Sequence, residues 1–185
     1  MGQGSSAPHP NDELRRQFSS WTLEQMRLSY KQYKEITIRF SVDIAQFADI
    51  LALDETAPET GAACKLFSTK RTPTMVDALE VLSGICMFCE ASLAEKIGYV
   101  FTLYDFNDSG TLTPDELTIL MRSTTRALAK IGGTAEPTVK DIERLCDEAF
   151  SFADIDSDGH ITQIEFAQWA SNKRVLLDFL GEISG

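Results

Sequence analysis

Apolar residues recur at helical spacing along this chain, in runs that are interrupted by short polar segments. In the second half, two polar segments are each preceded and followed by such a run. Apolar positions three and four residues apart lie on one face of a helix, so each unit is predicted to be a helix, a loop and a second helix. The positions with this spacing are Ile97, Val100, Phe101 and Tyr104, then Leu117, Leu120 and Met121, and, in the second unit, Ile142, Leu145, Cys146 and Phe150, then Phe166, Trp169 and Ala170.

Helix starts are marked by a hydroxyl residue followed three positions later by Glu, Gln or Asp. In such a capping box the hydroxyl accepts a hydrogen bond from a backbone amide of the first turn, and the acid or amide reaches back to the cap. With the apolar spacing, these boxes predict an all-α fold. The boxes are Thr22–Gln25, Ser92–Glu95, Thr113–Glu116, Thr138–Asp141 and Thr162–Glu165.

The two polar loops of the second half place oxygen-bearing side chains at regular intervals. They span residues 105–116 and 154–165, and are called loop 3 and loop 4 because two similar units precede them. Both fit the pattern D-x-[DN]-x-[DN]-G-x5-E, except that Ser109 stands at position 5 of loop 3. Gly110 and Gly159 occupy position 6, where the backbone turns sharply and a Cβ would clash. Calcium takes about six to eight oxygens, and this spacing supplies them. Two calcium sites are therefore predicted.

The predicted ligands alternate along each loop. Two of the ligand side chains in loop 3 are anionic and four in loop 4 are anionic, so we expect loop 4 to bind calcium first and more tightly. Whether magnesium occupies either loop at rest is left open. The ring of the loop-4 histidine should face solvent, because position 7 contributes its backbone carbonyl. The ligands are Asp105, Asn107, Ser109, the carbonyl of Thr111 and Glu116, with Thr113 through water, and Asp154, Asp156, Asp158, the carbonyl of His160 and Glu165, with Thr162 through water.

The first half repeats the same unit twice without the ligands. In the second unit, Val76 and Glu80 fall at positions 8 and 12, but positions 1, 3 and 5 are Thr69, Arg71 and Pro73, which cannot hold a divalent cation. The first unit, from about residue 22 to residue 47, is equally poor in ligands. Its loop contains Ile36, Ile38, Arg39 and Phe40.

These units divide the chain into three parts. Residues 1–20 are expected to be a flexible N-terminal segment, residues 21–91 a degenerate pair that binds no calcium, and residues 92–185 a functional pair followed by a C-terminal helix.

Composition narrows the function. A net charge of -11 argues against nucleic-acid binding, which needs clustered Lys and Arg. No run approaches the ~18 apolar residues of a membrane span, and the four cysteines form no secreted disulfide framework, so a cytoplasmic protein is expected. Cys86 and Cys89 lie in an apolar run and are interpreted as buried thiols. The two histidines, His9 and His160, suggest no catalytic site, and we expect no enzymatic activity.

The four units, with the second pair complete, resemble the EF-hand superfamily. The 49 residues from Asp105 to Asp154 are similar to the spacing in the neuronal calcium sensor branch of the calmodulin superfamily, over about residues 22–180. The pattern also resembles calcineurin B-type regulatory subunits and calaxin-like proteins of ciliary dynein arms, and the choice among the three stays open. The resemblance implies four EF-hands in two paired lobes, with Leu112 and Ile161 facing each other across a short strand pair.

The chain opens with Met1-Gly-Gln-Gly-Ser-Ser6, which fits the pattern for N-myristoylation at Gly2. A single myristoyl chain gives only marginal, reversible membrane contact. Membrane association and a ciliary or flagellar location are therefore alternatives to a purely cytoplasmic one.

Three functions are consistent with these observations. The first is a calcium sensor that exposes an apolar groove and binds a target helix or peptide. The second is a permanently docked subunit of a larger assembly, of a phosphatase or ciliary dynein type, in which calcium tunes stability. The third is a calcium buffer, which the two degenerate loops disfavour. The candidate groove residues are Phe101, Leu117, Leu120, Met121, Phe150, Phe166, Trp169, Leu176 and Leu177.

Overall fold

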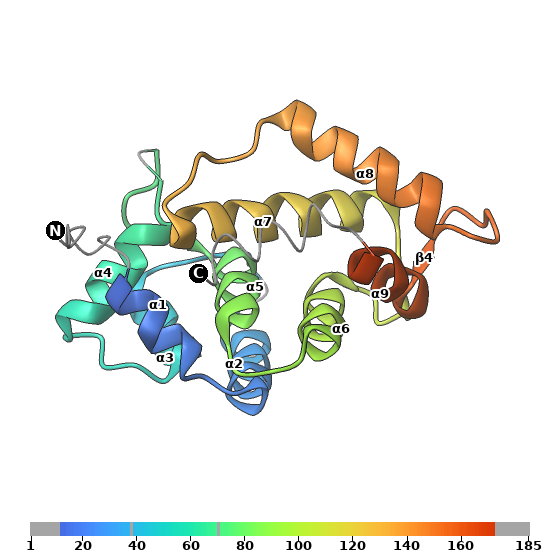
Figure 1. Cartoon of the computed structure of the whole chain (residues 1–185). Helices are drawn as coiled ribbons and strands as arrows, with labels where there is room; N and C mark the ends of the chain where they lie inside the picture. Colours follow the sequence, from blue (N-terminus) through green and yellow to red (C-terminus); the bar gives the residue numbers. More distant parts are fainter. Residues whose placement is uncertain (1–11, 38, 70, 173–185) are drawn as a thin grey trace, which may run out of the picture.

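The computed structural model describes residues 12–37, 39–69 and 71–172, and within these ranges the chain forms helices and two very small sheets (Figure 1). The predicted all-α fold with short β pairing between loops is confirmed. The elements are α1 (Asp12–Ser19), α2 (Leu23–Ile36), β1 (Ser41–Val42), α3 (Ile44–Leu51), α4 (Pro58–Phe67), β2 (Val76–Asp77), α5 (Ala78–Phe88), α6 (Leu93–Tyr104), β3 (Thr111–Leu112), α7 (Pro114–Gly132), α8 (Val139–Ala153), β4 (Ile161–Thr162) and α9 (Gln163–Asn172).

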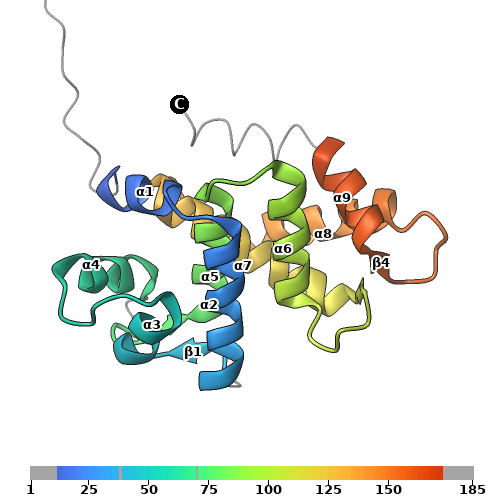
Figure 2. The ribbon, with the colours of Figure 1, turned by 90° about the horizontal axis from the view of Figure 1, so that it is seen from below.

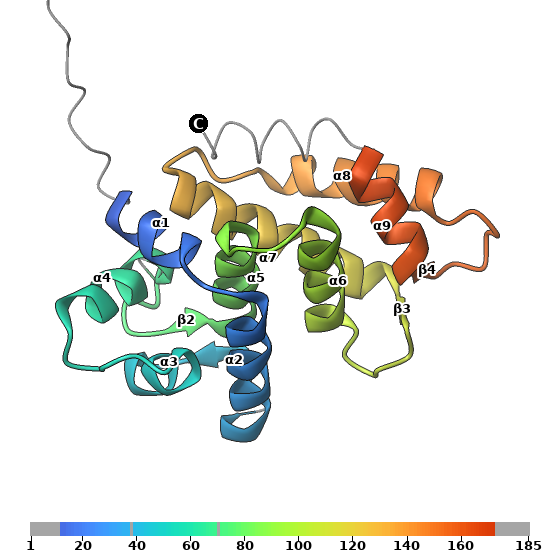
Figure 3. The same ribbon diagram turned by 60° about the horizontal axis from the view of Figure 1, so that its bottom comes forward.

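Each sheet joins the loops of two neighbouring helix–loop–helix units. β1 pairs antiparallel with β2, and Val42 lies opposite Val76. β3 pairs antiparallel with β4, and Leu112 lies opposite Ile161, as the resemblance to EF-hands implies. All four side chains are buried, so an apolar contact couples the loops of each pair. Figure 3 shows the first pair, with β2, on one side of the molecule and the second pair, with β3 and β4, on the other.

The helices begin where the capping boxes predict. Thr22, Ser92, Thr113 and Thr138 each accept from the amide three residues on, and the side chain of that residue reaches back to the cap. α7 ends at the residue pair Gly132–Gly133, where Gly133 adopts a left-handed conformation with φ of 69°. Local chemistry thus sets most of the helix boundaries.

The 19-residue helix α7 is long enough, at about 28 Å, to connect the two halves of the molecule. Figures 1 and 2 show it running from the end of loop 3 to the side of the molecule that carries α1, α4 and α5. Its last turn is held by α1, because the Arg15 guanidinium donates to the carbonyls of Ile131 (3.0 Å) and Gly132 (2.7 Å). A cation at the C-terminal end of a helix also complements the helix dipole.

A buried ion pair fastens the same end of α7 to α4 and α5. The ammonium of Lys130 contacts the carboxylate of Glu80 and donates to the carbonyl of Phe67 at 2.8 Å. The side chains of Lys130 and Glu80 are 8% and 6% exposed. Burial raises the pKa of Glu80, and the hydrogen bond from Lys130 opposes that change. Because water is excluded, each charge depends on the other for compensation.

Close packing between α5 and α7 requires a glycine. A Cβ on Gly84 would lie 2.7 Å from the Cβ of Ala127 and 3.2 Å from Cδ1 of Ile131. The helices therefore approach at a point where no larger side chain fits without movement of the backbone.

The N-terminal boundary differs from the expected flexible segment 1–20. Residues 12–19 form α1, whose Leu14 and Phe18 are buried in the core. This helix has only eight residues, so its pattern is weak in the sequence, and burial against neighbouring helices stabilises it. Gly2 and residues 173–185 lie outside the described residues.

All four cysteines are buried free thiols, which agrees with the interpretation of Cys86 and Cys89. Among the described residues, no helix is both long and apolar enough to cross a membrane.

Candidate calcium sites and the adjoining groove

Loop 3 connects α6 to α7 and gathers its predicted ligands around one centre. The carboxylate of Asp105 accepts from the backbone amides of Ser109 (2.9 Å) and Gly110 (2.8 Å). The side-chain oxygen of Asn107 accepts from the Ser109 amide at 3.0 Å, and the Ser109 hydroxyl donates to the carbonyl of Thr111 at 3.0 Å. These oxygens belong to positions 1, 3, 5 and 7, which the EF-hand pattern assigns to calcium.

Glu116 closes loop 3 from the start of α7. One of its carboxylate oxygens accepts from the backbone amide of Phe106 at 3.1 Å, and the other accepts from the amide and hydroxyl of Thr113 at 2.9 and 2.8 Å. Position 12 is therefore turned toward position 2, across the mouth of the loop. Since Glu116 lies in the first turn of α7, its position is tied to the orientation of that helix.

Loop 4 connects α8 to α9 and repeats this arrangement. Asp154 accepts from the amides of Asp158 (3.1 Å) and Gly159 (3.1 Å), and Glu165 accepts from the amide of Ile155 (3.1 Å). Hydrogen bonds from Thr162, first from its amide and then from its hydroxyl, lower the pKa of Glu165. An ionised carboxylate at position 12 is the form that a calcium site requires.

Three carboxylates of loop 4 come together. Asp154, Asp156 and Asp158 bring oxygens within 4.8 Å of one another. Like charges at this separation repel, and a divalent cation between them would relieve the repulsion. The donor set consists of hard oxygens, which fits calcium or magnesium. His160 donates its backbone amide to Asp158 at 2.8 Å, and the residue is exposed, as expected for a position that offers its carbonyl.

The two loops share the same backbone conformation. Gly110 and Gly159, at position 6, have φ of 79° and 81°. Asp108 and Ser157, at position 4, have φ of 53° and 57°, which is unusual for residues with a Cβ. Two independent loops with the same left-handed residues indicate that both are shaped for the same ligand.

The loops differ in burial. Asp105 is 9% exposed and Glu116 is 7% exposed, so the ends of loop 3 are covered by protein. Asp154 and Glu165 are half-buried, and the rest of their loop is largely exposed. Figures 1 and 3 show the segment between α8 and β4 projecting away from the helices. Sequence reasoning did not find this difference, because it depends on what packs around each loop.

The degenerate loops use the corresponding positions for other contacts. Asp43, directly after β1, caps α3 together with Gln46, and Asp77 caps α5. The carboxylate of Glu80, at position 12, is directed to Lys130 of α7 instead of to a loop.

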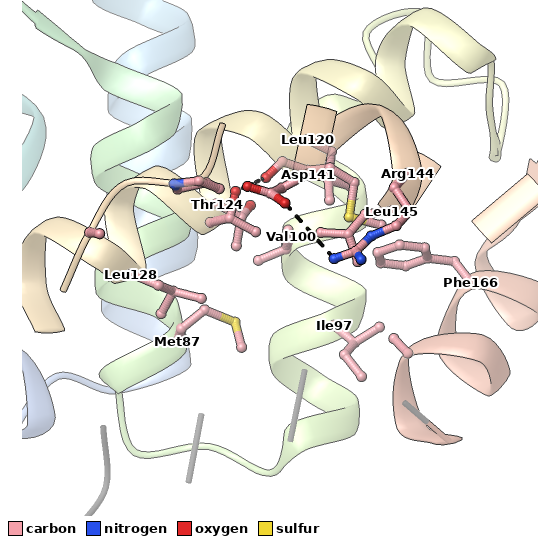
Figure 4. A pocket seen from close by; sticks show the side chains of 15 residues that line it. Met87, Ile97, Val100, Leu120, Thr124, Leu128, Asp141, Arg144, Leu145 and Phe166 are labelled. Carbon is pink, nitrogen blue, oxygen red and sulfur yellow. Dashed lines mark hydrogen bonds and ion pairs between the residues drawn. The ribbon is translucent and has the colours of Figure 1, made fainter. Parts of the chain in front are cut away.

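A groove of about 220 Å³ lies next to the calcium loops (Figure 4). Its walls come from α6, α7, α8 and α9, which are the helices that enter and leave loops 3 and 4, and Met87 of α5 closes one end. The lining is mostly apolar, and Asp141 and Arg144 form a polar edge with 3.9 Å between their charged groups. Labelled lining residues in Figure 4 include Ile97, Val100, Leu120, Leu128, Leu145 and Phe166.

The predicted groove residues are only partly those that line it. Leu120, Met121 and Phe166 do so. Among the other described candidates, Phe101, Leu117 and Trp169 are buried in the core, and Phe150 packs against the core. Leu176 and Leu177 lie outside the described residues. The sequence could have indicated Ile97 and Val100, which share the apolar face of α6, but helical spacing does not distinguish a groove wall from a core.

This fold, with paired loops that present oxygens at fixed positions, defines an EF-hand protein. In agreement, the EF-hand domain pair family matches residues 94–171, which contain loops 3 and 4. The match supports calcium binding by the second half of the chain.

Similarity to individual proteins extends over a little more than half of the chain. The chain is 24% identical over 112 residues to calaxin of Xenopus laevis and 26% identical over 106 residues to calaxin of Homo sapiens. It is 30% identical over 121 residues to a recoverin-family protein of Dictyostelium discoideum. These alignments cover 60%, 57% and 57% of this chain and 52%, 48% and 51% of the relatives, so the chain spans about half the length of the curated relatives it matches. The chain is thus an EF-hand calcium-binding protein that resembles calaxin and recoverin-family proteins.

Proposed function

We propose that this protein is a calcium sensor in which loops 3 and 4 hold the ion and the groove beside them binds a target. The observation that carries the proposal is the shared use of four helices. α6, α7, α8 and α9 border both the calcium loops and the groove. Because Glu116 and Glu165 lie where α7 and α9 begin, any change in their coordination is passed to helices that form the groove walls.

The ion would supply positive charge to carboxylates that otherwise repel one another. In loop 3 the side chains of Asp105, Asn107, Ser109 and Glu116 and the carbonyl of Thr111 would hold it. In loop 4 the proposed ligands are Asp154, Asp156, Asp158, Glu165 and the carbonyl of His160. Both sets fit the oxygen ligands that calcium prefers, and magnesium at rest fits them as well.

The proposed partner is an amphipathic helix or peptide with basic residues. An apolar groove of this kind accepts the apolar face of a helix. The net charge of -11 favours association with a positively charged segment and disfavours nucleic acid. The proposed output is binding, and we expect no catalytic activity.

Calcium and target binding can be tested with one peptide. The probe is a synthetic helix with Leu at positions i, i+3, i+4 and i+7 and Lys elsewhere, titrated by calorimetry in calcium and in chelator. We expect binding in calcium only, and no binding by the Glu116→Gln/Glu165→Gln double variant. Leu145→Gln should weaken peptide binding without changing calcium binding, because Leu145 lines the groove. Leu28→Gln is the matched control, because Leu28 is an exposed leucine outside the groove.

Equal peptide binding in calcium and chelator would contradict the sensor function. Equilibrium dialysis that finds no bound metal at millimolar calcium would remove the calcium sites altogether.

Myristoylation of Gly2 is part of the proposal and would provide reversible membrane contact. Co-expression with an N-myristoyltransferase should add one acyl chain by mass spectrometry, and Gly2→Ala should prevent it. The acylated protein should then sediment with lipid vesicles more than the Gly2→Ala control does. An unmodified wild-type chain in this experiment would exclude the lipid anchor.

A second candidate function is that of a subunit permanently docked in a larger assembly. Its support is the similarity to calaxin, which also favours a ciliary location over a general cytoplasmic one. Size-exclusion chromatography of native extract in chelator separates the two functions. A docked subunit would elute in a large complex without calcium, whereas a recruited sensor would elute at the size of the free chain.

A further inference from the structure

Loop 3 is in contact with an aromatic ring from the first half of the molecule, which contains the two degenerate loops. The ring of Phe40, between α2 and β1, lies against the ring of Phe106, which is position 2 of loop 3. Their centroids are 5.3 Å apart and the rings are tilted by 32°. Phe106 also meets Tyr104 at 6.1 Å in an edge-on arrangement. The first residue after the leading ligand Asp105 is therefore in contact with a ring of α6, the helix that enters loop 3, and with a ring of the degenerate first unit.

Hydrogen bonds fix the backbone at Phe40. Its carbonyl accepts a hydrogen bond from the amide of Ala78 at 2.7 Å, and the β1–β2 pairing begins at the next residue, Ser41. The two degenerate loops are thus joined by backbone hydrogen bonds, and the first of them contacts loop 3 through the ring of Phe40.

Tyr30 of α2 makes a second contact between the same two regions. Its hydroxyl donates to the carbonyl of Thr102, in the last turn of α6, at 3.4 Å. Its ring packs between Tyr33 and Tyr99, with centroid distances of 6.2 and 6.4 Å. Burial raises the pKa of Tyr30, and the charges of Asp108 and Asp105 raise it further.

Loop 4 has no equivalent support among the described residues. Its position 2 is Ile155, which is 70% exposed, whereas Phe106 is 43% exposed. The segment between α8 and β4, which contains loop 4, also projects from the molecule (Figure 3). Two loops with the same backbone and the same internal hydrogen bonds therefore differ in how firmly the rest of the chain holds them.

We propose that Phe40 and Tyr30 are positioning residues for calcium at loop 3, so that the unit without ligands prepares the neighbouring loop for the ion. The inference rests on the proposed function, because it requires calcium at loop 3. A loop that is already ordered loses less conformational entropy when it binds. By linkage, an ion in loop 3 stabilises the packing of Phe40 and Tyr30 by the same free energy as this packing adds to calcium binding. The degenerate first unit then has a role in calcium binding without touching the ion.

The test isolates loop 3 and removes the ring. In a Glu165→Gln background, Phe40→Ala should weaken calcium binding about three- to tenfold by calorimetry, the range expected for loss of one aromatic pair. Phe40→Tyr keeps the ring and should keep the affinity. Leu28→Ala, which removes an exposed apolar side chain from α2, should have no effect. In a Glu116→Gln background, which isolates loop 4, Phe40→Ala should leave calcium affinity unchanged.

Hydrogen exchange in chelator provides a readout that does not depend on calcium. Phe40→Ala should speed exchange of the amides of Ser109 and Gly110 in loop 3, and not those of Asp158 and Gly159 in loop 4. Unchanged affinity and exchange at loop 3, or an equal loss at both loops, would overturn the positioning role. A Glu165→Gln protein that binds no calcium would instead overturn calcium binding at loop 3 and, with it, the proposed function of that loop.

Discussion

The first and second halves of this chain are built from the same helix–loop–helix unit, yet they use the acid at position 12 differently. In the second half, Glu116 and Glu165 turn back to the amides at position 2 of their own loops. In the first half, Glu80 turns away from its loop and pairs with Lys130 of α7 in a buried site. The two position-12 carboxylates of the second half face their own calcium loops, whereas Glu80 has a permanent cation supplied by the protein.

The consequence is a difference in permanence. We expect a unit whose buried acid is paired with a lysine to need no metal ion for its stability, whereas the carboxylates of Asp154, Asp156 and Asp158 repel one another unless a cation lies between them. The first half can therefore act as the fixed base of the molecule. It holds the C-terminal end of α7 through Arg15 and Lys130, while the other end of α7 begins in loop 3.

The largest effect is expected from breaking the permanent pair. Lys130→Met should lower the free energy of unfolding by about 3–5 kcal/mol, because Glu80 is left as an uncompensated buried acid. Urea denaturation in chelator measures this change. The double variant Glu80→Leu/Lys130→Met should recover most of the stability. The matched control is Lys31→Met, since Lys31 and Glu35 form an exposed pair that should contribute little.

An unchanged free energy of unfolding in Lys130→Met would show that Glu80 does not need the charge of Lys130 for compensation.

A smaller loss is expected where the two halves pack most closely. Gly84→Val should cost about 1–3 kcal/mol by overpacking, because the new side chain meets Ala127 and Ile131. Gly61→Ala, within α4, should instead stabilise the protein by about 0.5–1 kcal/mol, since nothing lies within 4 Å of the added Cβ. Thermal unfolding should show a lower melting temperature for Gly84→Val and a higher one for Gly61→Ala. A neutral Gly84→Val would mean that α5 and α7 can separate without cost.

The two calcium loops should differ in affinity by roughly tenfold, or ~1.4 kcal/mol. Loop 4 has four anionic ligand side chains and loop 3 has two, so charge favours loop 4, although loop 3 is better supported by its surroundings. Calorimetric titration of Glu165→Gln should remove the tighter phase, and Glu116→Gln the weaker one. Loss of the weaker phase in Glu165→Gln would show that support by Phe40 and Tyr30 outweighs ligand charge.

The smallest effect concerns the helix that leads into loop 4. Thr138→Ala removes the capping box of α8 and should cost about 1 kcal/mol of stability. Thr22→Ala removes the matching cap of α2 in the first half and should lower stability by about the same amount. Hydrogen exchange locates each effect. Because Thr138→Ala loosens the less supported loop, its exchange increase should extend into residues 154–159, whereas Thr22→Ala should leave both calcium loops unchanged.

Much of the local structure could be predicted from residues alone. The capping boxes at Thr22, Ser92, Thr113 and Thr138 act within four residues, so their hydrogen bonds follow directly from the sequence. The calcium loops are equally local, because ligand spacing and a glycine at position 6 determine the path of the backbone. The pairing of Leu112 with Ile161 followed from the resemblance to paired EF-hands.

Contacts between distant segments could not be predicted in this way. Helix α1 carries too few apolar positions to stand out, and only the core formed by other helices gives Leu14 and Phe18 a place. Nor does any spacing rule bring Lys130 to Glu80 or Phe40 to Phe106. The groove had the same difficulty, since an apolar helical face looks alike in sequence whether it lines a core or a groove.

By itself, therefore, the sequence determined the helix starts that carry capping boxes, the two oxygen-lined loops and the loss of ligands in the first half, because each depends on interactions within about a dozen residues. The tertiary structure alone decided which loop is supported, where Glu80 finds its cation and which apolar faces remain open as a groove. Those features arise from packing between segments far apart in the chain, and packing is a property of the assembled fold.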